Sequence, residues 1–414
     1  MERNLRLLAV GFAIRTLGAA MYAPFLALFL YSILGVGYFE IGVIFLGLGA
    51  VQLPCSLIGG LWTDRVGRRR LILVSMVTET ILTASLGYAF YVRSLGLAIA
   101  FAALGGALLA ATSASFSAYI ADHAVGSERT LGFTWYRIGF NAGYAAGVAI
   151  GGLLVAILGF PGVLFLSATF IAVAAIFLIA FLAPSPYDLS LRHGAHPVTN
   201  GKTQAAPARG LRESFALLAQ DRVALMTATA FALIGLTVSQ WNVTYSLFVH
   251  NKLGISYALL GVGLAINGLV VVFGQSFTTH RVLGMRHTTI GILGAVFYVA
   301  AFLLLGVAAL WVLFPVALFF VASVVLTFGE NLESIPTSTL PSNLAPPSEV
   351  GAYNGAFNMF IGASAIFAAF IGGAVLSAVS NPLAEWVLLC LPAIPGILLL
   401  RYASRRISGT ADRA

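Results

Sequence analysis

Long apolar stretches separated by short polar segments fill almost the whole chain. About 20 mostly apolar residues are needed to cross the ~30 Å hydrocarbon core of a bilayer, so each stretch of that length predicts one membrane-spanning helix. Twelve stretches qualify, at residues 5–34, 37–63, 71–92, 95–120, 133–158, 161–183, 223–249, 256–279, 288–308, 311–333, 352–378 and 383–402. The weakest separations are residues 35–37 and 159–161. The pattern predicts an all-α membrane protein with twelve spans.

The composition excludes a soluble protein. Of the 414 residues, 60% are hydrophobic and 9% are charged, whereas soluble proteins average about 25% charged residues. The first apolar run is too long for the core of a signal peptide, and we expect it to be retained as the first span. The sequence has no Cys/His ligand set, no phosphate-binding glycine loop and no Ser-His-Asp pattern outside the spans. We therefore predict no enzyme activity, no cofactor and no metal site.

Basic residues lie in short clusters between the apolar stretches. Twelve spans place both termini on one side of the membrane, and eighteen Arg and Lys residues fall on that side. On the other side lie only Arg93 and Lys252. Because cytoplasmic loops carry the excess of Lys and Arg, this asymmetry predicts cytoplasmic termini in a plasma-membrane protein. The clusters do not form one basic face, so the net charge of +8 does not predict binding to nucleic acid.

The longest polar segment, residues 184–222, divides the chain in two. It is rich in Pro, Ser, Gly and Ala, and we interpret it as a cytoplasmic linker that ends in a short surface helix. His193 and His196 have a metal-like spacing but no further ligand nearby, so we interpret them as solvated. The predicted parts are a six-helix bundle (1–183), the linker (184–222), a second six-helix bundle (223–402) and a cytoplasmic tail (403–414).

The two halves repeat one another. Residues 38–49 match residues 257–268 in Tyr, Gly and Val positions, and residues 136–141 match residues 353–358. A weaker echo of residues 65–68 occurs at 281–286. Three matches at nearly one offset predict two bundles related by duplication. Two similar bundles that rock about a central site are a common plan for transporters, and the alternative is a duplicated membrane protein with no transport path.

A short charged loop between the second and third spans carries the strongest motif. It has the spacing G-x-x-x-D-R-x-G-R-R, formed by Gly60, Asp64, Arg65, Gly67, Arg68 and Arg69, with Trp62 in the position that is usually Leu. This spacing resembles the same loop of major facilitator superfamily transporters. The resemblance covers essentially the whole chain and implies a twelve-helix fold that moves a small molecule by alternating access. Because no nucleotide-binding motif is present, we expect an ion gradient or facilitated diffusion as the driving force.

The resemblance also assigns roles within this loop. In the family, the Asp of the motif binds near the start of span eleven when the cytoplasmic side is closed, and a helix N-terminus stabilises a carboxylate. We therefore expect Asp64 to act as a conformational latch, with Gly60, Arg65, Gly67 and Arg68 as candidate parts of the cytoplasmic gate. For Arg68 and Arg69 we favour a simpler interpretation, as topology anchors that touch anionic lipid.

Two further motifs concern coupling. Residues 147–152 resemble the G-P-x-x-G-G element of family antiporters, but Val148 replaces the proline, and glycines at intervals of four also serve close helix packing. Gly329 and Glu330, before Pro336, resemble drug/proton antiporter-like members. The resemblance implies proton-coupled efflux of a hydrophobic or drug-like compound. Uptake of a small anionic metabolite by symport or facilitated diffusion, and a non-transporting receptor or scaffold, stay open as alternatives.

Charged residues inside the apolar stretches need a reason, because each costs at least ~2.5–3.5 kcal/mol on insertion scales. Arg15 lies ~15 Å and Glu79 ~12 Å into their spans, at 1.5 Å per residue. Arg15 is expected to bind an anionic substrate, to pair with Glu330 or Glu333, or to serve a structural pair. Glu79 is expected to carry a proton or to act as a helix-packing partner. We place Glu330 and Glu333 near the cytoplasmic end of span ten.

The remaining candidates are polar groups at the span ends and inside the spans. We expect Asp122, Arg129 and Arg137 to form a cytoplasmic gate network. The candidate lining of a substrate or proton pathway includes Asn141, Gln240, Asn242, Asn267 and Asn358. The expected partners are a small-molecule substrate, protons and membrane lipid, and the expected state is a monomer.

Overall fold

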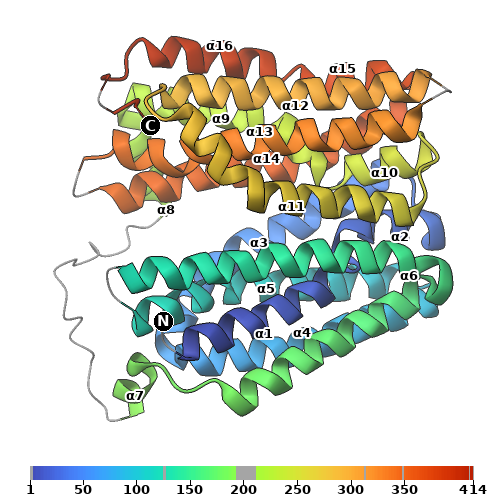
Figure 1. Cartoon of the computed structure of the whole chain (residues 1–414), viewed down its shortest axis with the longest axis vertical. Helices are drawn as coiled ribbons and strands as arrows, with labels where there is room; N and C mark the ends of the chain where they lie inside the picture. Colours follow the sequence, from blue (N-terminus) through green and yellow to red (C-terminus); the bar gives the residue numbers. More distant parts are fainter. Residues whose placement is uncertain are drawn as a thin grey trace. The chain divides into compact units, whose positions relative to one another are not determined.

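The computed structural model describes residues 3–124, 127–192, 211–311, 314–346, 349–409 and 411–413, and all regular elements among them are helices (Figure 1). The first half contains α1 (Arg3–Ala20), η1 (Ala23–Phe25), α2 (Leu26–Leu34), α3 (Tyr38–Val66), α4 (Arg68–Tyr91), α5 (Leu95–His123), α6 (Ser127–Phe181) and α7 (Pro186–Arg192). The second half contains α8 (Leu211–Gln220), α9 (Arg222–Val238), η2 (Ser239–Trp241), α10 (Thr244–Asn251), α11 (Tyr257–Val282), α12 (His287–Leu310), α13 (Pro315–Leu344), α14 (Val350–Ala378), α15 (Pro382–Cys390) and α16 (Ala393–Ser404).

The helices match the predicted spans. In the described residues, 11 helical segments are long and apolar enough to cross a membrane, and one of them, Leu131–Phe181, is 51 residues long. That segment breaks at Gly159, whose φ of 64° and ψ of 173° are not helical and favour glycine. Two spans therefore lie within it, on either side of the weak separation noted in the sequence. The prediction of an all-α membrane protein with twelve spans is confirmed.

The first and seventh spans are interrupted at equivalent places. α1 and α2 are joined through the short 3₁₀ helix η1, and α9 and α10 are joined through η2. In the first span the break contains Pro24, whose ring prevents regular helix hydrogen bonding. The second break has no proline. The two interruptions therefore do not depend on the same residue type, and their equivalent positions support the duplication.

The chain divides into two compact units. Unit 1 contains Met1–Gly37, Ile44–Asn200 and Ser256–Leu269, and unit 2 contains Tyr38–Val43, Gly201–Ile255 and Val270–Ala414. In unit 1, α1 packs along α6, and α4 packs against α5 and α6 (Figure 1). In unit 2, α12 packs against α13, and α9 packs against α14 and α16. Buried cores centred on Phe12 in unit 1 and on Phe231 in unit 2 hold these helices together.

The glycines of α6 allow it to touch its neighbours backbone to backbone. A Cβ added to Gly143, Gly147 or Gly151 would collide with backbone carbonyls of α1 or of the residue after it. One added to Gly152 would collide with the carbonyl of Tyr257 at the start of α11, also in unit 1. The packing interpretation of this glycine element is confirmed, since small residues let membrane helices approach closely.

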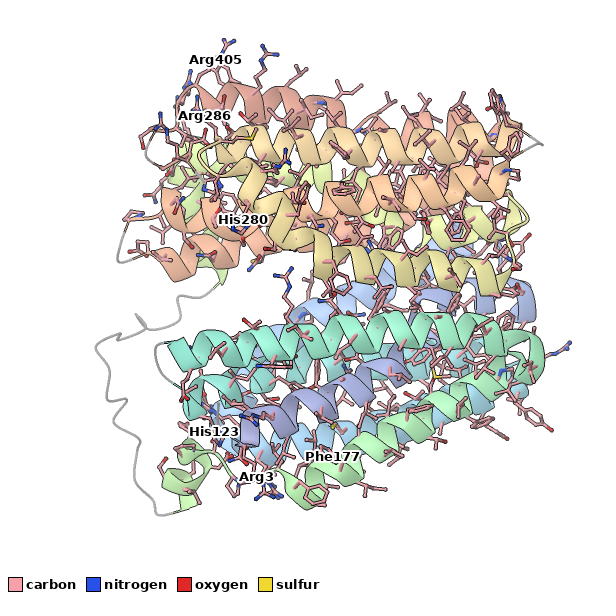
Figure 2. The ribbon with its side chains drawn as sticks, in the orientation of Figure 1. Arg3, His123, Phe177, His280, Arg286 and Arg405 are labelled. Atoms are coloured by element: carbon pink, nitrogen blue, oxygen red, sulfur yellow. The ribbon has the colours of Figure 1, made fainter. Side chains whose placement is uncertain are left out.

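In unit 2, the segment after α16 is fastened to the start of α12. Figure 2 shows Arg286 and Arg405 at the same end of this unit. The Asp412 carboxylate is fully buried and accepts hydrogen bonds from Arg286 Nε (2.6 Å), Thr288 N (2.9 Å) and Thr288 Oγ1 (2.7 Å). The Asp412 carbonyl accepts from His287 N at 2.8 Å. A carboxylate at a helix N-terminus satisfies amides that lack helical partners, so Asp412 fastens the described residues that follow α16 to the folded unit.

We expect Asp412→Ala to destabilise unit 2 by about 2–3 kcal/mol, because it removes hydrogen bonds to a charged group and leaves a half-exposed Arg286 without its acid. The measurement is the midpoint of heat-induced unfolding in detergent. The midpoint of Asp412→Asn, which keeps one acceptor oxygen, should lie between those of Asp412→Ala and the parent protein. Arg405→Gln on the same segment serves as the control and should leave the midpoint unchanged. Equal midpoints for Asp412→Ala and the parent protein would contradict this role.

Candidate functional site

The two charges predicted at membrane depth in the first half bind each other. Arg15 on α1 donates from Nε to Glu79 Oε2 at 2.8 Å and from Nη2 to Glu79 Oε1 at 2.7 Å. The two side chains are only 7% and 14% exposed. This two-point geometry is the strong form of an Arg–carboxylate pair. The partner of Arg15 is therefore Glu79 on α4, and the pairing with Glu330 or Glu333 that we expected is wrong. Structural pairing was one of the roles that the sequence left open for Arg15 and for Glu79, and the structure shows that pairing.

Aromatic rings of unit 1 lie beside this ion pair. The Arg15 guanidinium carbon is 5.5 Å from the centre of the Phe12 ring. Phe12 in turn stacks on Tyr136 of α6, with ring centres 4.2 Å apart, and contacts Phe116 of α5 at 5.0 Å. Because rings exclude water, the attraction between the two charges is weakly screened. The pair ties α1 to α4 within the same core that holds α5 and α6.

Two acids of α13 lie well inside the helix and not at its end. The sequence led us to end span ten near residue 333, but α13 continues through Pro336 and Pro341 to Leu344. Glu330 and Glu333 therefore lie near the middle of a helix of 30 residues rather than near its cytoplasmic end. Their spacing of three places them on one face of the helix. Glu333 forms no ion pair with any Arg, Lys or His among the described residues.

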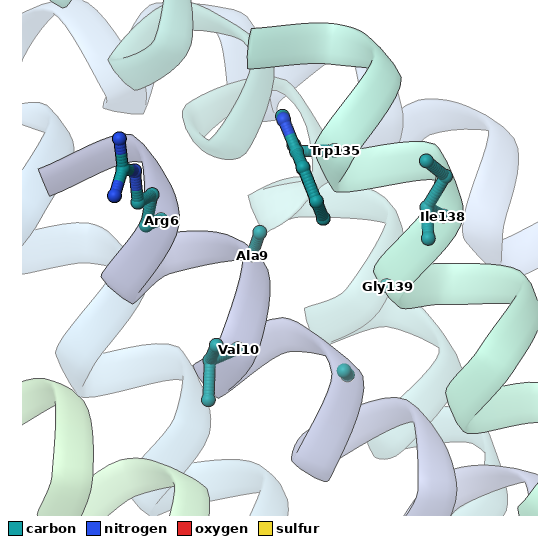
Figure 3. Close-up of a pocket in the computed structure, with 7 residues that line it drawn as sticks. Arg6, Ala9, Val10, Trp135, Ile138 and Gly139 are labelled. Carbon is teal, nitrogen blue, oxygen red and sulfur yellow. The ribbon is translucent and has the colours of Figure 1, made fainter. Parts of the chain in front are cut away.

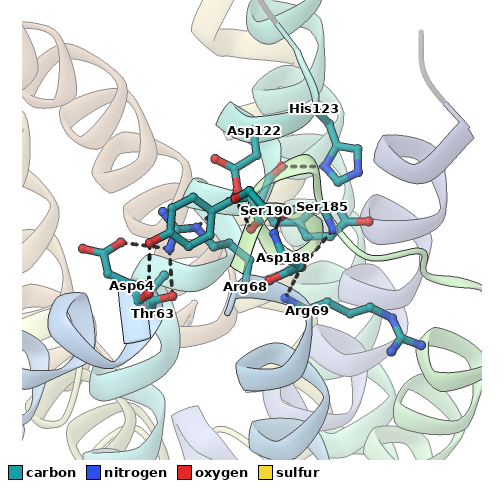
Figure 4. A network of polar contacts seen from close by, with 11 residues as sticks. Thr63, Asp64, Arg68, Arg69, Asp122, His123, Ser185, Asp188 and Ser190 are labelled. Carbon is teal, nitrogen blue, oxygen red and sulfur yellow. Dashed lines mark hydrogen bonds and ion pairs between the residues drawn. The ribbon is translucent and has the colours of Figure 1, made fainter. Parts of the chain in front are cut away.

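The loop motif is the centre of a polar network in unit 1 (Figure 4). Arg68 is only 8% exposed. Its Nη1 lies 2.8 Å from Asp64 Oδ1 and donates to the Thr63 carbonyl at 2.8 Å. Its Nε lies 3.2 Å from Asp122 Oδ2, an ion-pair distance without the alignment of a hydrogen bond. The guanidinium also stacks 3.5 Å from the Tyr187 ring centre. The interpretation of Arg68 as a mere topology anchor was wrong.

Arg69 is also used structurally. Its Nε donates to the Leu182 carbonyl at 2.5 Å and its Nη2 to the Ile179 carbonyl at 3.2 Å, both at the end of α6. Carbonyls at a helix C-terminus lack helical partners, and an Arg side chain satisfies them. We expected Arg69 to touch anionic lipid, and this was wrong, because its Nε and Nη2 groups bind protein carbonyls.

Three residues that the sequence reasoning missed complete this network. Ser185 and Asp188 bond reciprocally at the start of α7, with Ser185 N donating to Asp188 Oδ2 at 2.8 Å and Asp188 N donating to Ser185 Oγ at 3.1 Å. Asp188 Oδ2 also accepts from the backbone N of Arg69 at 3.1 Å. The third residue is Tyr187, whose hydroxyl donates to the Asp64 carbonyl at 3.0 Å. The signal was present, since Ser-Pro-Tyr-Asp is a capping box with Pro at the first helical position.

The expected gate network of Asp122, Arg129 and Arg137 is assembled differently. Asp122 lies beside Arg68 and accepts from Ser185 Oγ at 3.1 Å. Arg129 and Arg137 have exposed side chains on α6. The acid at the end of α5 is thus joined to the loop motif and to α7. Arg65 of the motif is exposed, and Gly67, with a φ of 95°, makes the turn between α3 and α4 that favours glycine.

The polar pathway candidates fall into two groups. Gln240 is buried and donates to the carbonyls of Leu236 and Ala368, at 3.0 and 3.1 Å, so it joins η2 to α14. Asn141 and Asn242 donate back to carbonyls of their own helical segments. Asn267 is buried and Asn358 is exposed. Gln240 therefore has a packing role. The two members of the symmetric pair differ in exposure, since Asn141 is half-buried and Asn358 is exposed.

A groove that the sequence did not reveal lies between α1 and α6 (Figure 3). Its volume is about 430 Å³, within the usual range for small-molecule pockets. It is lined by Arg6, Ala9, Val10, Ala13, Trp135, Ile138 and Gly139. Arg6 had served only to orient the chain, and Trp135 had no distinguishing pattern. The groove exists because α1 and α6 touch at small residues, which no single-sequence pattern specifies.

The fold and these sites define a multi-pass membrane protein built from two repeated helical units. Residues 8–369 match the model of the Major Facilitator Superfamily. The chain belongs to this family, whose matched members are membrane transporters and not enzymes. The resemblance stated from the loop motif is confirmed, and relatives that include tetracycline resistance proteins are consistent with the drug/proton antiporter-like subgroup.

Relatives and solved structures agree with this assignment. The chain is 24% identical to the uncharacterized MFS-type transporter YttB of Bacillus subtilis (strain 168), covering 91% of this chain and 89% of the relative. It is 27% identical to the class E tetracycline resistance protein of Escherichia coli, covering 77% and 76%. A crystal structure of a POT family transporter with a thioalcohol-conjugated peptide superposes with a TM-score of 0.75 at 15% identity, covering 98% and 97%. At this identity the structural match shows the fold alone.

Proposed function

We propose that this transporter exports a small hydrophobic or drug-like compound across the plasma membrane in exchange for protons. The repeated bundles 1–183 and 223–402 would open a substrate path to each side of the membrane in turn, as parallel repeats do in this superfamily. Export is supported by two relatives named as tetracycline resistance proteins, both 27% identical to this chain. A membrane transporter confers resistance to a compound by removing it from the cell.

Proton coupling is carried by one observation, the position of Glu333. It lies near the middle of α13, beside Glu330 on the same helix face and without a basic ion-pair partner in the described chain. Two like charges three residues apart on one helix face repel each other, and binding a proton removes the repulsion. Glu79 is less suited to this role, because Arg15 already compensates its charge. Glu333 is the residue that we assign to proton exchange, with Glu330 beside it.

The proposed orientation follows from charge. Eighteen basic residues on the side of the termini favour a cytoplasmic location for both termini and for the linker 184–222. The exposed Arg65 and Arg70 on this side would contact anionic lipid. We take the monomer as the transporting form. The remaining partners are the exported compound and protons.

The uptake of an anionic metabolite, our first alternative, depended on an uncompensated Arg15. Because Arg15 binds both oxygens of Glu79, it offers no free positive charge to such a substrate. The position of Arg15 in the first span therefore no longer favours uptake of an anionic metabolite. A receptor or scaffold without transport remains distinguishable by experiment.

The proposal is tested in proteoliposomes that contain a pH-sensitive dye. An imposed proton gradient should drive tetracycline or another member of a panel of hydrophobic compounds across the membrane, and the substrate should in turn move protons. Empty liposomes give the passive leak of each compound. No flux above that leak under any gradient would exclude transport of the compounds in the panel, and flux without proton movement would exclude the coupling.

We propose that Asp64 is a latch for the cytoplasm-closed state, as the motif implies. Its side chain is 63% exposed and paired with Arg68, so it can exchange partners at little cost. In a protein lacking Cys55 and Cys390, Asp64→Asn should increase labelling of a cysteine placed at the exposed Ile138, because the closed state loses a carboxylate contact. Glu40→Gln, an exposed acid at the other end of α3, is the control. Unchanged labelling would reduce Asp64 to a partner of Arg68.

A further inference from the structure

A row of hydroxyl groups runs along α13 in unit 2. Glu330 is followed at intervals of four residues by three serines, Ser334, Ser338 and Ser342. Residues four apart form a ridge on a helix surface, and at 1.5 Å per residue they are about 6 Å apart along the axis. One water molecule spans that separation with two hydrogen bonds of about 2.8 Å. This serine row leads from the acid pair of Glu330 and Glu333 to the end of the helix.

Amide side chains of two neighbouring helices hold the serine row at both ends. Gln275 on α11 donates from Nε2 to Ser334 Oγ at 3.0 Å. Asn354 on α14 donates from Nδ2 to Ser342 Oγ at 2.8 Å. A serine hydroxyl that accepts from an amide keeps its own proton to donate, and Ser334 Oγ donates it to the Asn331 carbonyl at 3.0 Å. Each of these hydroxyls can therefore accept a proton from one neighbour and give one to another.

Two buried polar atoms beside the serine row have no hydrogen-bond partner among the described residues. Asn331 is 1% exposed, and its Nδ2 donates to the Val270 carbonyl of α11 at 3.5 Å, but its Oδ1 accepts from no group. Thr278 on α11 is 6% exposed, and its Oγ1 is likewise unpartnered. A Cβ added to Gly274, one turn before Thr278, would lie 3.2 Å from Asn331 Nδ2, so this face of α11 meets α13 there. Because an unsatisfied buried polar atom is costly, such atoms in proteins bind ordered water.

From the serine row and these two atoms we propose that the seam between α11 and α13 holds water and carries protons between the end of α13 at Leu344 and the acid pair. Each water and each serine accepts a proton as it passes its own on, so only the glutamate that ends the row changes charge. The residues of α13 between Glu333 and Leu344 include no charged group that would trap the proton. The inference rests on the proposed function and adds the path by which its protons reach the acids.

Water in the seam is tested by thiol labelling, which needs no transport. In a protein lacking Cys55 and Cys390, Ser334→Cys is compared with Val296→Cys, at an apolar residue 49% exposed on α12. The two positions are about 15 and 14 Å from their helix ends at 1.5 Å per residue, so they are matched in depth. A cationic methanethiosulfonate attacks thiols that ionise in water, and we expect Ser334→Cys to react about tenfold faster or more. Equal rates would overturn the proposal.

The proton path is tested by a matched pair of substitutions at Ser338. Val and Thr have the same shape, and only Thr keeps a hydroxyl. We expect Ser338→Val to lower proton-driven transport by about tenfold or more and to leave counterflow unchanged, whereas Ser338→Thr should retain both. Thr278→Val, inside the seam, should act like Ser338→Val. Thr279→Val is the control and should change neither activity, because the Thr279 hydroxyl is already bound to the Gln275 carbonyl at 2.8 Å.

The two arms separate failure of the path from failure of the export function. Equal driven transport in Ser338→Val and Ser338→Thr, in a parent protein that couples protons, would overturn the path and keep the export function. Rapid labelling of Ser334→Cys in a protein that moves no compound and no protons would refute the export function, and the proton role of the seam with it. Rapid labelling together with the loss of driven transport in Ser338→Val and Thr278→Val is the result that we expect.

Discussion

Glu333→Gln is expected to abolish proton-driven transport while substrate exchange continues. The carboxylate near the middle of α13 has no ion-pair partner in the described chain and lies on the same face as Glu330, so it is suited to gain and lose a proton during the cycle. Gln has the same shape and cannot exchange a proton. Gradient-driven uptake into inverted vesicles should fall about a hundredfold or more, the scale on which proton-transfer groups contribute.

The decisive comparison is between driven transport and counterflow. Counterflow exchanges labelled for unlabelled substrate without net proton movement, so Glu333→Gln should retain it. Glu40→Gln, an exposed acid at the start of α3, should retain both activities. Loss of counterflow together with driven transport would indicate a folding or binding defect. Full driven transport in Glu333→Gln would remove Glu333 from the proton pathway and direct attention to Glu330.

The membrane architecture could be predicted because it depends on properties that are local in the sequence. The length of an apolar stretch determines whether it spans the bilayer, and the break at Gly159 was visible as a Gly-x-Pro separation. The duplication was visible because equivalent helices keep equivalent small residues. These features need no knowledge of which helices touch.

Span ten shows the limit of this local reasoning. The apolar stretch that predicted span ten ends at residue 333, before Pro336 and Pro341, and proline normally ends or kinks a helix. In α13 the helix continues through both prolines, which membrane helices tolerate when neighbours satisfy the freed backbone groups. The predicted span ended at residue 333, which put Glu330 and Glu333 at its end, whereas in α13 they lie near the middle of the helix. The position of an acid within its helix therefore depended on packing that the sequence does not display.

The choice of partners could not be predicted for the same reason. The sequence showed that Arg15 and Glu79 both needed compensation at depth, but α1 and α4 are separated by another span, and the facing of each helix decides which charges meet. The partners of Arg68 could not be predicted either, because Asp122 comes from α5 and the ring of Tyr187 comes from α7. Only the reciprocal pair of Ser185 and Asp188 could have been predicted from the sequence, because Ser-x-x-Asp is a capping-box pattern, and we overlooked it.

Arg15→Met is expected to destabilise the protein by about 3–5 kcal/mol, the usual cost of leaving one partner of a buried ion pair uncompensated. Both side chains are at most 14% exposed, so water cannot replace the lost contact. Glu79→Gln in the same protein should recover much of the loss, because the double variant no longer buries a charge. Arg3→Met, exposed on the same helix, controls for the substitution itself. Stability is measured as the unfolding midpoint in denaturant within bicelles.

The double-variant cycle also separates the two roles that the sequence left open for Glu79. If the pair serves packing, Arg15→Met and Glu79→Gln each lower stability, their effects are non-additive by about 0.5–3 kcal/mol, and the double variant still couples substrate to protons. If Glu79 itself carries the proton, the double variant is stable and uncoupled. Additive effects on stability would show that the ion pair contributes no energy of its own. Because Glu79 is held by two hydrogen bonds and Glu333 by no ion pair in the described chain, we expect the first outcome, with coupling lost only when Glu333 is changed.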